Sequence, residues 1–235
     1  MSDETAISVH FGKPMPLFPL DSAVLLPQQV LPLHIFEPRY RQMIEHCLDG
    51  AGQIAMATFA GQAWKQEYHG RPPLRPAVCI GQIAQHERAP EGRYHILLQG
   101  VCRARILREV PPVQGRLYRM AILEPAETDP DAAESLGEAR ATITELLSHD
   151  PLSRMAAAEP ILEWLNNEDI PSAALLELVS FTIINEPKVR YRLLAEGHAA
   201  ARAELIIGEL KHISRLATRA AAQHPEQWPK GCSWN

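Results

Sequence analysis

The feature that most constrains the fold is a change in hydrophobic spacing near Pro125. Before this residue, short apolar runs alternate with glycine and proline, which is typical of strands joined by turns. After it, apolar residues recur every three or four positions, the spacing of amphipathic helices. Strands followed by helices, without regular alternation between the two, predict an α+β chain.

In the first part we expect strands over residues 15–20, 30–36, 53–59, 78–83, 94–98, 101–107 and 117–123. One short amphipathic helix is expected between Pro38 and Gly50, because proline suits the first helical turn. Consecutive strands without helices between them predict an antiparallel sheet that closes into a barrel. Proline cannot donate a ladder hydrogen bond, so strands that carry Pro16, Pro19 or Pro32 should lie at edges or contain bulges.

In the second part the spacing predicts helices from Pro130 through Leu147, over 155–165, and after Ser172, which can act as an N-cap. The helix after Ser172 is apolar on more than one face and should be the most buried. A single long helix is expected over 188–222, weakened locally by Gly197. The resulting domain prediction is a β-barrel domain over 1–125, a helical domain over 126–224 and a loose tail over 225–235.

Charge and composition exclude several classes of protein. Residues 1–125 hold 13 Lys and Arg against 11 Asp and Glu, a balance of +2, and the rest holds 10 against 17, a balance of −7. An acidic second half without a basic cluster does not favour nucleic acid as a partner. No apolar stretch approaches the roughly 20 residues that cross a bilayer, and the acidic start is unlike a signal peptide. We therefore expect a cytoplasmic protein without a membrane partner, and its scattered cysteines are expected to be reduced thiols.

A series of segments is distinctive when taken in order: 16–20 (PLFPL), 26–27 (LP), 31–40 (LPLHIFEPRY), 80–83 (IGQI), 100–106 (GVCRARI) and the stretches 185–194 and 202–210. This series resembles the Lon protease N-terminal domain family. The resemblance implies a PUA-like pseudo-barrel followed by packed helices, and a role in holding unfolded or tagged polypeptides. No G-x-x-x-x-G-K-[ST] loop occurs among the 235 residues. We therefore expect a stand-alone recognition module, without ATPase or protease domains, without catalysis and without a cofactor.

Aromatic residues are the first candidates for binding such a partner. Trp64 and Tyr68 lie in the long polar connection 60–76, and exposed aromatic residues are enriched at binding hot spots. Together with Phe36 and Tyr40 they would form an apolar rim for an extended or partly unfolded polypeptide. The alternative, that they cover the end of the barrel, is equally compatible with the sequence.

Arginines carry the alternative hypothesis of a PUA-like RNA-binding module. Arg103 and Arg105 alternate along one expected strand, and the resemblance implies a fold that includes RNA binders. The strands have no interleaved aromatic residues for base stacking, so solvent-facing arginines are the favoured interpretation.

An enzymatic role is the third alternative, and it needs a deep pocket with converging polar groups. Glu37, Arg39 and Tyr40 mark a strand-to-helix corner whose charges are better explained by ion pairing and by the helix dipole than by catalysis. The ten histidines show no metal-ligand spacing, so no metal is expected. Cys47 and Cys79 are expected to be buried thiols rather than nucleophiles.

Overall fold

The computed structural model describes residues 7–61, 63–66, 70–127 and 133–222. Contacts divide the protein into two compact units, the first formed by residues up to 130 together with Asn185–His198 and the second by 131–184 together with the residues from 199 onward. The segment 185–198 thus packs with the strands, although the sequence placed it with the helices. The expected tail over 225–235 lies outside the described residues.

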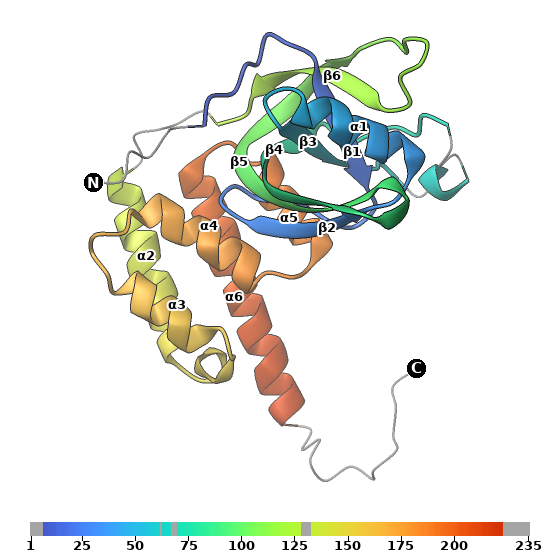
Figure 1. Ribbon diagram of the computed structural model, residues 1–235. Coiled ribbons are helices and arrows are strands. Elements are labelled where there is room, and N and C mark those ends of the chain that lie inside the picture. Colours follow the sequence, from blue (N-terminus) through green and yellow to red (C-terminus); the bar gives the residue numbers. More distant parts are fainter. Residues whose placement is uncertain (1–6, 62, 67–69, 128–132, 223–235) are drawn as a thin grey trace, which may run out of the picture. The chain divides into compact units, whose positions relative to one another are not determined.

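The first unit is built on a mixed six-stranded sheet (Figure 1). Its strands are β1 (Met15–Leu20), β2 (Val30–Ile35), β3 (Gln53–Thr58), β4 (Ala77–Ala89), β5 (Arg93–Glu109) and β6 (Arg119–Pro125). The order is β2-β5-β4-β3-β1-β6, and an additional pairing of β5 with β6 closes five of the strands into a ring. The apolar core cluster lies on strands of that ring and includes Leu17, Ile80 and Leu123. The predicted α+β class with a pseudo-barrel is confirmed.

One pairing differs from the expected antiparallel sheet, because β1 and β3 run parallel. The segment between them contains β2 and the helix α1 (Pro38–Leu48), which provide the crossover that a parallel pair requires. The prolines of β1 are accommodated by a change of partner along the strand. Pro16 pairs with β6 and Pro19 pairs with β3. Each proline therefore lies at a position of β1 that is paired with only one of the described strands.

β5 is a single strand of 17 residues, although the sequence suggested two strands separated at Gly100. The strand continues through a register shift, where Gly100 lies opposite Gly81. Gly100 also exchanges backbone hydrogen bonds of 2.8 Å with Gln28 and Gln29. A Cβ atom at position 100 would lie 2.1 Å from the carbonyl oxygen of Leu26. The glycine therefore marks a close approach of two backbones rather than a turn.

Two helices cover the barrel of the first unit. The helix α1 buries one face, formed by Tyr40, Met43, Ile44 and Cys47, as its i, i+3, i+4 spacing predicts. The helix α5 (Pro187–Ala195) is joined to β4 by its Tyr191, whose hydroxyl accepts a hydrogen bond of 3.0 Å from the backbone N–H of Ala77.

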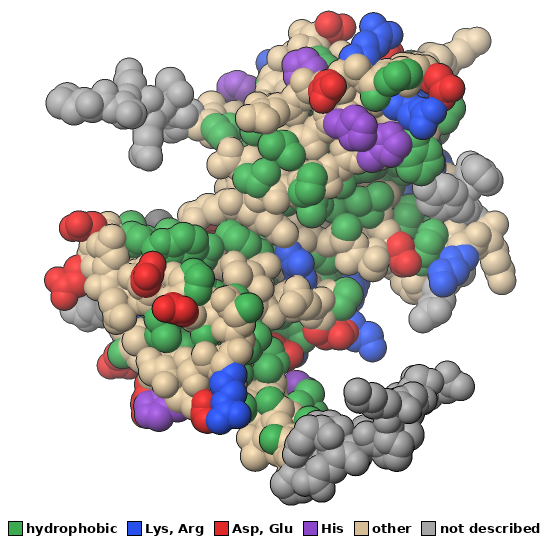
Figure 2. Space-filling view, turned by 60° about the horizontal axis from the view of Figure 1, so that its bottom comes forward, with side chains coloured by type: hydrophobic (Ala, Val, Ile, Leu, Met, Phe, Trp, Pro, Cys, Tyr) green, Lys and Arg blue, Asp and Glu red, His purple; other side chains and the backbone are tan. Residues whose placement is uncertain are grey.

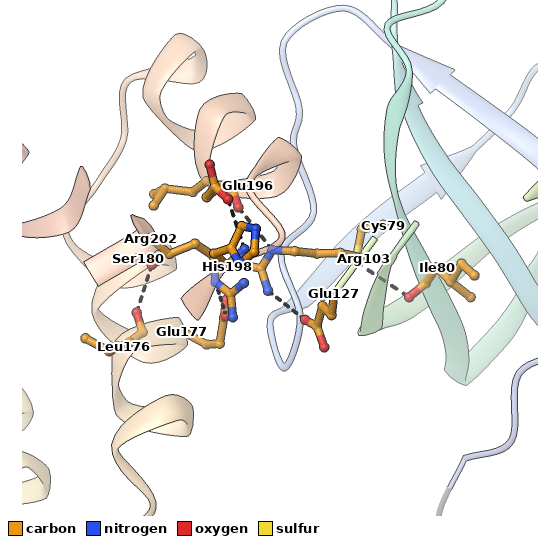
Figure 3. Close-up of polar contacts among 11 residues, drawn as sticks. Cys79, Ile80, Arg103, Glu127, Leu176, Glu177, Ser180, Glu196, His198 and Arg202 are labelled. Atoms are coloured by element: carbon orange, nitrogen blue, oxygen red, sulfur yellow. Dashed lines mark hydrogen bonds and ion pairs between the residues drawn. The ribbon is translucent and has the colours of Figure 1, made fainter. Parts of the chain in front are cut away.

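The second unit is all helical. It contains α2 (Ala133–Ser148), the short 3₁₀ turn η3 (Leu152–Arg154), α3 (Ala158–Leu165), α4 (Ser172–Thr182) and α6 (Ala199–Ala221). The helix α4 buries Leu175, Leu176 and Val179 together with the charged Glu177. Arg202 of α6 pairs with Glu177 at 3.4 Å (Figure 3), so this buried carboxylate has a cationic partner.

The expected long helix over 188–222 is wrong, because these residues form α5 and α6 with a break at 196–198. Glu196 has an extended backbone, and its carboxylate accepts a 2.9 Å hydrogen bond from the backbone N–H of His198 (Figure 3). Gly197 stands between them and has a low helix propensity. Among the described residues, no helix has the length and apolar character needed to cross a membrane.

Candidate functional site

The edge strand β2 presents an unusual row of side chains to solvent. Its burial alternates, so that Val30, Pro32 and His34 are exposed while Ile35 is 2% exposed and belongs to the core. Val30 is 50% exposed, and Phe36, directly after the strand, is 60% exposed. Large apolar side chains thus follow one solvent-facing row of a strand that also lacks any charged residue.

The neighbouring strands extend this row into a surface. His95 of β5 lies opposite His34, and Leu97 lies opposite Pro32. The two imidazole rings stack with their centroids 4.7 Å apart, and the ring of Phe36 lies 5.8 Å from that of His34. We call this surface the outer β2–β5–β4 face, defined by Val30, Pro32, His34, Phe36, His95, Leu97 and, on β4, Gln85 and Glu87.

The outer β2–β5–β4 face is hollowed into a shallow groove of about 600 Å³. Its lining combines Pro32, Leu33 and Leu97 with the two stacked histidines. Figure 2 shows purple histidine side chains next to green hydrophobic ones on one face of the protein. β2 pairs only with β5 among the described strands, so its other edge has no strand partner there. Such an exposed apolar patch on a sheet edge is typical of an interaction surface.

Of the four aromatic residues expected to form a rim, the structure describes three, and it buries one of them. Tyr40 is 3% exposed, packs edge-to-face on Phe18 at 4.6 Å and donates a hydrogen bond to the carbonyl of Pro19. Trp64 stacks on Phe59, with centroids 5.0 Å apart. Tyr68 lies outside the described residues. Of the three described residues of the set, Phe36 belongs to the outer β2–β5–β4 face.

Arg103 is not a solvent-facing arginine, which corrects the sequence interpretation. It is 1% exposed, its Nε donates a 3.0 Å hydrogen bond to the carbonyl of Leu193, and its Nη1 lies 3.1 Å from a carboxylate oxygen of Glu127 (Figure 3). The guanidinium therefore ties β5 to the segment 185–198 within the first unit. Arg103 has a structural role and is not available to a nucleic acid.

The other arginines near Arg103 do not build an RNA surface either. Arg105 is exposed, but Arg119 is engaged by Glu109 and by the carbonyl of Pro72. Arg75 packs its guanidinium over the ring of Tyr191 at 3.6 Å. The RNA-binding alternative thus loses its leading residue and is not favoured.

The corner at the start of α1 is an ion-paired turn. Arg39 Nη2 lies 3.0 Å from Glu37 Oε2, and its guanidinium lies 4.5 Å from the centre of the Tyr40 ring. This pair is local, between residues two apart, and it fits the expected structural role of this corner.

The cysteines of the first unit are poor nucleophiles. Burial raises the pKa of the Cys47 thiol to about 12, and burial together with the charge of Glu127 raises the pKa of Cys102 to about 11. The Cys79 thiol is fully buried and donates to the carbonyl of Ile80. A thiol with so high a pKa is almost entirely neutral at pH 7, so it lacks the thiolate that attack requires. Among the described residues, no group of three or more His, Cys, Asp or Glu is placed to hold a metal ion.

Sequence reasoning missed most of the outer β2–β5–β4 face. The alternation of Val30, Pro32 and His34 was used to predict a strand, but it equally shows which side chains share one side. His95 and Leu97 could not be assigned to the same surface, because only the strand register places them opposite β2.

Comparisons with known proteins identify the family to which this fold belongs. The family described as the substrate-binding domain of ATP-dependent protease La (LON) matches residues 14–212, and the chain belongs to this family. The resemblance to the Lon N-terminal domain family, predicted from the sequence motifs, is confirmed.

Two curated relatives are Lon proteases. One, from Desulfosudis oleivorans, is 30% identical over 91 residues, which are 39% of this chain and 11% of the relative. The other, from Campylobacter concisus, is 23% identical over 190 residues, which are 78% of this chain and 23% of the relative. The match therefore spans less than a quarter of the length of each of these relatives.

Two solved structures share the fold. The N-terminal domain of the Mycobacterium avium complex Lon protease aligns with a TM-score of 0.62 at 18% identity, covering 85% of this chain and 98% of that domain. The Lon N-terminal domain protein from Xanthomonas campestris aligns with a TM-score of 0.53 at 21% identity, covering 83% of this chain and 98% of that protein chain. At these identities the likeness concerns the fold alone.

Proposed function

We propose that this protein is a recognition module that binds extended or partly unfolded polypeptide segments on the outer β2–β5–β4 face, without chemical turnover. The observation that carries the proposal is the row of exposed apolar side chains on an edge strand, ending in Phe36 at 60% exposure. A partner rich in apolar side chains would remove this row from water, which is the main driving force of most protein association.

The family supports a polypeptide as the occupant. Its description names a substrate-binding domain of an ATP-dependent protease, and the substrate of a protease is a polypeptide. The 235 residues contain no phosphate-binding loop. The thiols of Cys47 and Cys102 have raised pKa values, which does not favour either as a nucleophile. Both observations support binding without turnover.

The size of the surface suits weak, reversible binding. Full burial of a phenylalanine or valine side chain contributes about 1.5 to 3 kcal/mol, and these two side chains are half or more exposed before binding. Association also costs several kcal/mol of translational, rotational and side-chain freedom. Dissociation constants of tens of micromolar are therefore expected, which fits a site that must hold and release many sequences.

Fluorescence anisotropy with a labelled, permanently unfolded polypeptide tests the proposal. We expect saturable binding, weakened about tenfold in the double variant Val30→Ser, Phe36→Ser, because about 1.4 kcal/mol of apolar burial is lost. The matched control is Leu107→Ser, Val113→Ser, which removes two other exposed apolar side chains, 59% and 51% exposed, from the same unit. Absence of saturable binding, or equal weakening in both double variants, would contradict the proposed surface.

A further inference from the structure

A second pocket of the first unit differs from the outer β2–β5–β4 face in chemistry. It has a volume of about 320 Å³ and lies among β1, the start of α1 and the loop 110–118 that joins β5 to β6. Its apolar wall includes Leu17, Pro19 and the ring of Tyr40. Four guanidinium groups line it, those of Arg39, Arg71, Arg116 and Arg119. We call it the arginine pocket.

Two carboxylates neutralise part of this charge. Glu109 pairs with Arg71 at 2.7 Å and with Arg119 through both of its oxygens, while Glu37 pairs with Arg39. Burial by itself would raise the pKa of Glu109, but hydrogen bonds and charges from Arg119 and Arg71 outweigh it and lower the pKa. Among the residues that the structure describes, the four guanidinium groups outnumber these two carboxylates, which leaves a local excess of positive charge.

Arg116 carries part of that excess. It is half-buried, and its side chain makes no hydrogen bond or ion pair with any residue in the described ranges. Its backbone is nevertheless held in place, because its N–H donates to the carbonyl of Val113 at 3.1 Å. The side-chain amide of Gln42 on α1 binds the loop on both sides of Arg116. Its nitrogen donates to the carbonyl of Gly115 at 2.7 Å, and its oxygen accepts from the N–H of Leu117 at 2.8 Å.

A positioned guanidinium beside apolar walls is suited to a particular kind of anion. Guanidinium groups bind carboxylates through two parallel hydrogen bonds, and such charge-assisted bonds are stronger than neutral ones. The apolar wall would accept the carbon skeleton that carries the carboxylate. Leu117, which is 58% exposed, lies beside Arg116 on the rim of the pocket.

We propose that the arginine pocket binds a carboxylate of the polypeptide ligand through Arg116. The inference rests on the proposed function and adds a chemical preference to it, because an apolar face by itself does not distinguish one hydrophobic segment from another. The carboxylate belongs either to the C-terminus of the ligand or to one of its acidic side chains, and the two sources share the same chemistry.

Three versions of one apolar peptide test the inference with the 235-residue protein. The first has a free C-terminal carboxylate, the second a C-terminal amide, and the third a C-terminal amide with one internal Gln replaced by Glu. We expect the first or the third to bind about tenfold more tightly than the second, since one charge-assisted hydrogen bond is worth at least about 1.4 kcal/mol in a partly buried site. The version that gains affinity identifies the source of the carboxylate.

Variants assign the preference to the pocket. Arg116→Gln should abolish the tenfold preference, and Arg116→Lys should retain part of it, because the charge persists without the planar fork. Arg215→Gln, on the exposed part of α6, removes the same charge far from the pocket in sequence and should keep the full preference. Arg116 lies in a loop and contributes to no core cluster among the described residues, so both Arg116 variants should fold with an unchanged thermal midpoint.

The outcomes separate this inference from the proposed function. Equal affinity of all three peptides, or a preference that survives in Arg116→Gln, overturns the carboxylate site while leaving polypeptide binding intact. If no version of the peptide binds saturably, the proposed function and this inference both fail.

Discussion

The two halves of β5 use the same strand in opposite ways. Its first half, residues 93–99, pairs with the edge strand β2 and presents His95 and Leu97 to the shallow groove. Its second half, residues 102–109, closes the barrel against β6 and carries the buried Arg103 and the ion-paired Glu109. The first half thus presents the exposed His95 and the half-buried Leu97 where a partner is expected, while Arg103 and Glu109 of the second half have partners within the fold.

This contrast teaches that residue type alone does not assign a role in this fold. A buried charge persists only where its hydrogen bonds are satisfied, as they are for Arg103. An exposed apolar row persists only at a modest cost in solubility, which function explains more readily than stability does. Substitutions of Arg103 and Glu109, the paired charges of the second half, should therefore cost stability, and substitutions beside the first half should cost binding.

The largest loss of unfolding free energy is expected for Arg103→Met. The substitution leaves the buried carbonyl of Leu193 without its donor, which costs up to about 3 kcal/mol. It also takes the cation away from Glu127, whose side chain is 49% exposed. Urea unfolding followed by circular dichroism measures the loss. Arg105→Met, on the exposed side of the same strand, is the control and should change the free energy of unfolding by less than about 0.5 kcal/mol. Equal losses would remove the distinction between a structural and a surface arginine.

Gly100→Ala, at the junction of the two halves of β5, should give the second-largest loss of stability. The added Cβ would lie 2.1 Å from a backbone oxygen of Leu26, so either β5 or the loop must move, and such overpacking costs about 2 to 3 kcal/mol. Gly137→Ala in α2 is the control, because no atom lies within 4 Å of its added Cβ and alanine favours a helix by about 0.5 to 1 kcal/mol. Thermal unfolding should therefore shift in opposite directions for the two variants. A harmless Gly100→Ala would show that the close approach does not hold β5 continuous.

Glu109→Gln should give a smaller loss of unfolding free energy, and this loss should depend on pH. Pairs with Arg119 and Arg71 outweigh the opposing effect of burial and lower the pKa of Glu109 below its ordinary value of 4.5. The folded state thus binds this proton less readily than the unfolded state, so the stabilisation is present above about pH 4.5 and is lost as the pH falls through the lower folded value. At pH 7 the substitution should cost about 1 kcal/mol, since the carboxylate is partly exposed.

Urea unfolding of wild type and Glu109→Gln between about pH 7 and pH 3 checks this sign. The difference in unfolding free energy should shrink on acidification, whereas the exposed Glu124→Gln on β6 should differ little from wild type throughout. A difference that grows at low pH would contradict the assignment of Glu109 as an ionised partner of the two arginines.

The smallest effect on stability is expected beside the first half of β5. Phe36→Ser should leave the free energy of unfolding within about 0.5 kcal/mol of wild type, because its ring is 60% exposed and packs mainly on His34. The same variant should weaken polypeptide binding in the anisotropy experiment. A large loss of stability would instead make this ring a part of the core and would weaken the contrast between the halves.

Much of the local structure was predictable from the sequence. Periodicity placed the strands and helices, including the buried stripe of α1, because alternation by two or by 3.6 residues is set by backbone geometry. It failed at Gly100 and at 196–198, where long-range backbone approach and a local cap decided whether an element continued. The domain boundary near Pro125 stays a prediction, while the structure groups 185–198 with the sheet.

By itself the sequence determined the α+β class, the order of the elements and membership in the Lon substrate-binding family, because these depend on patterns within short segments. Only the tertiary structure decided that Arg103 and Tyr40 are buried and that Phe36 is exposed. It also brought Val30, His95 and Leu97 onto one surface and set Arg116 beside three other arginines. The physical reason is that burial and charge pairing are properties of neighbours distant in sequence, which strand register and helix packing alone bring together.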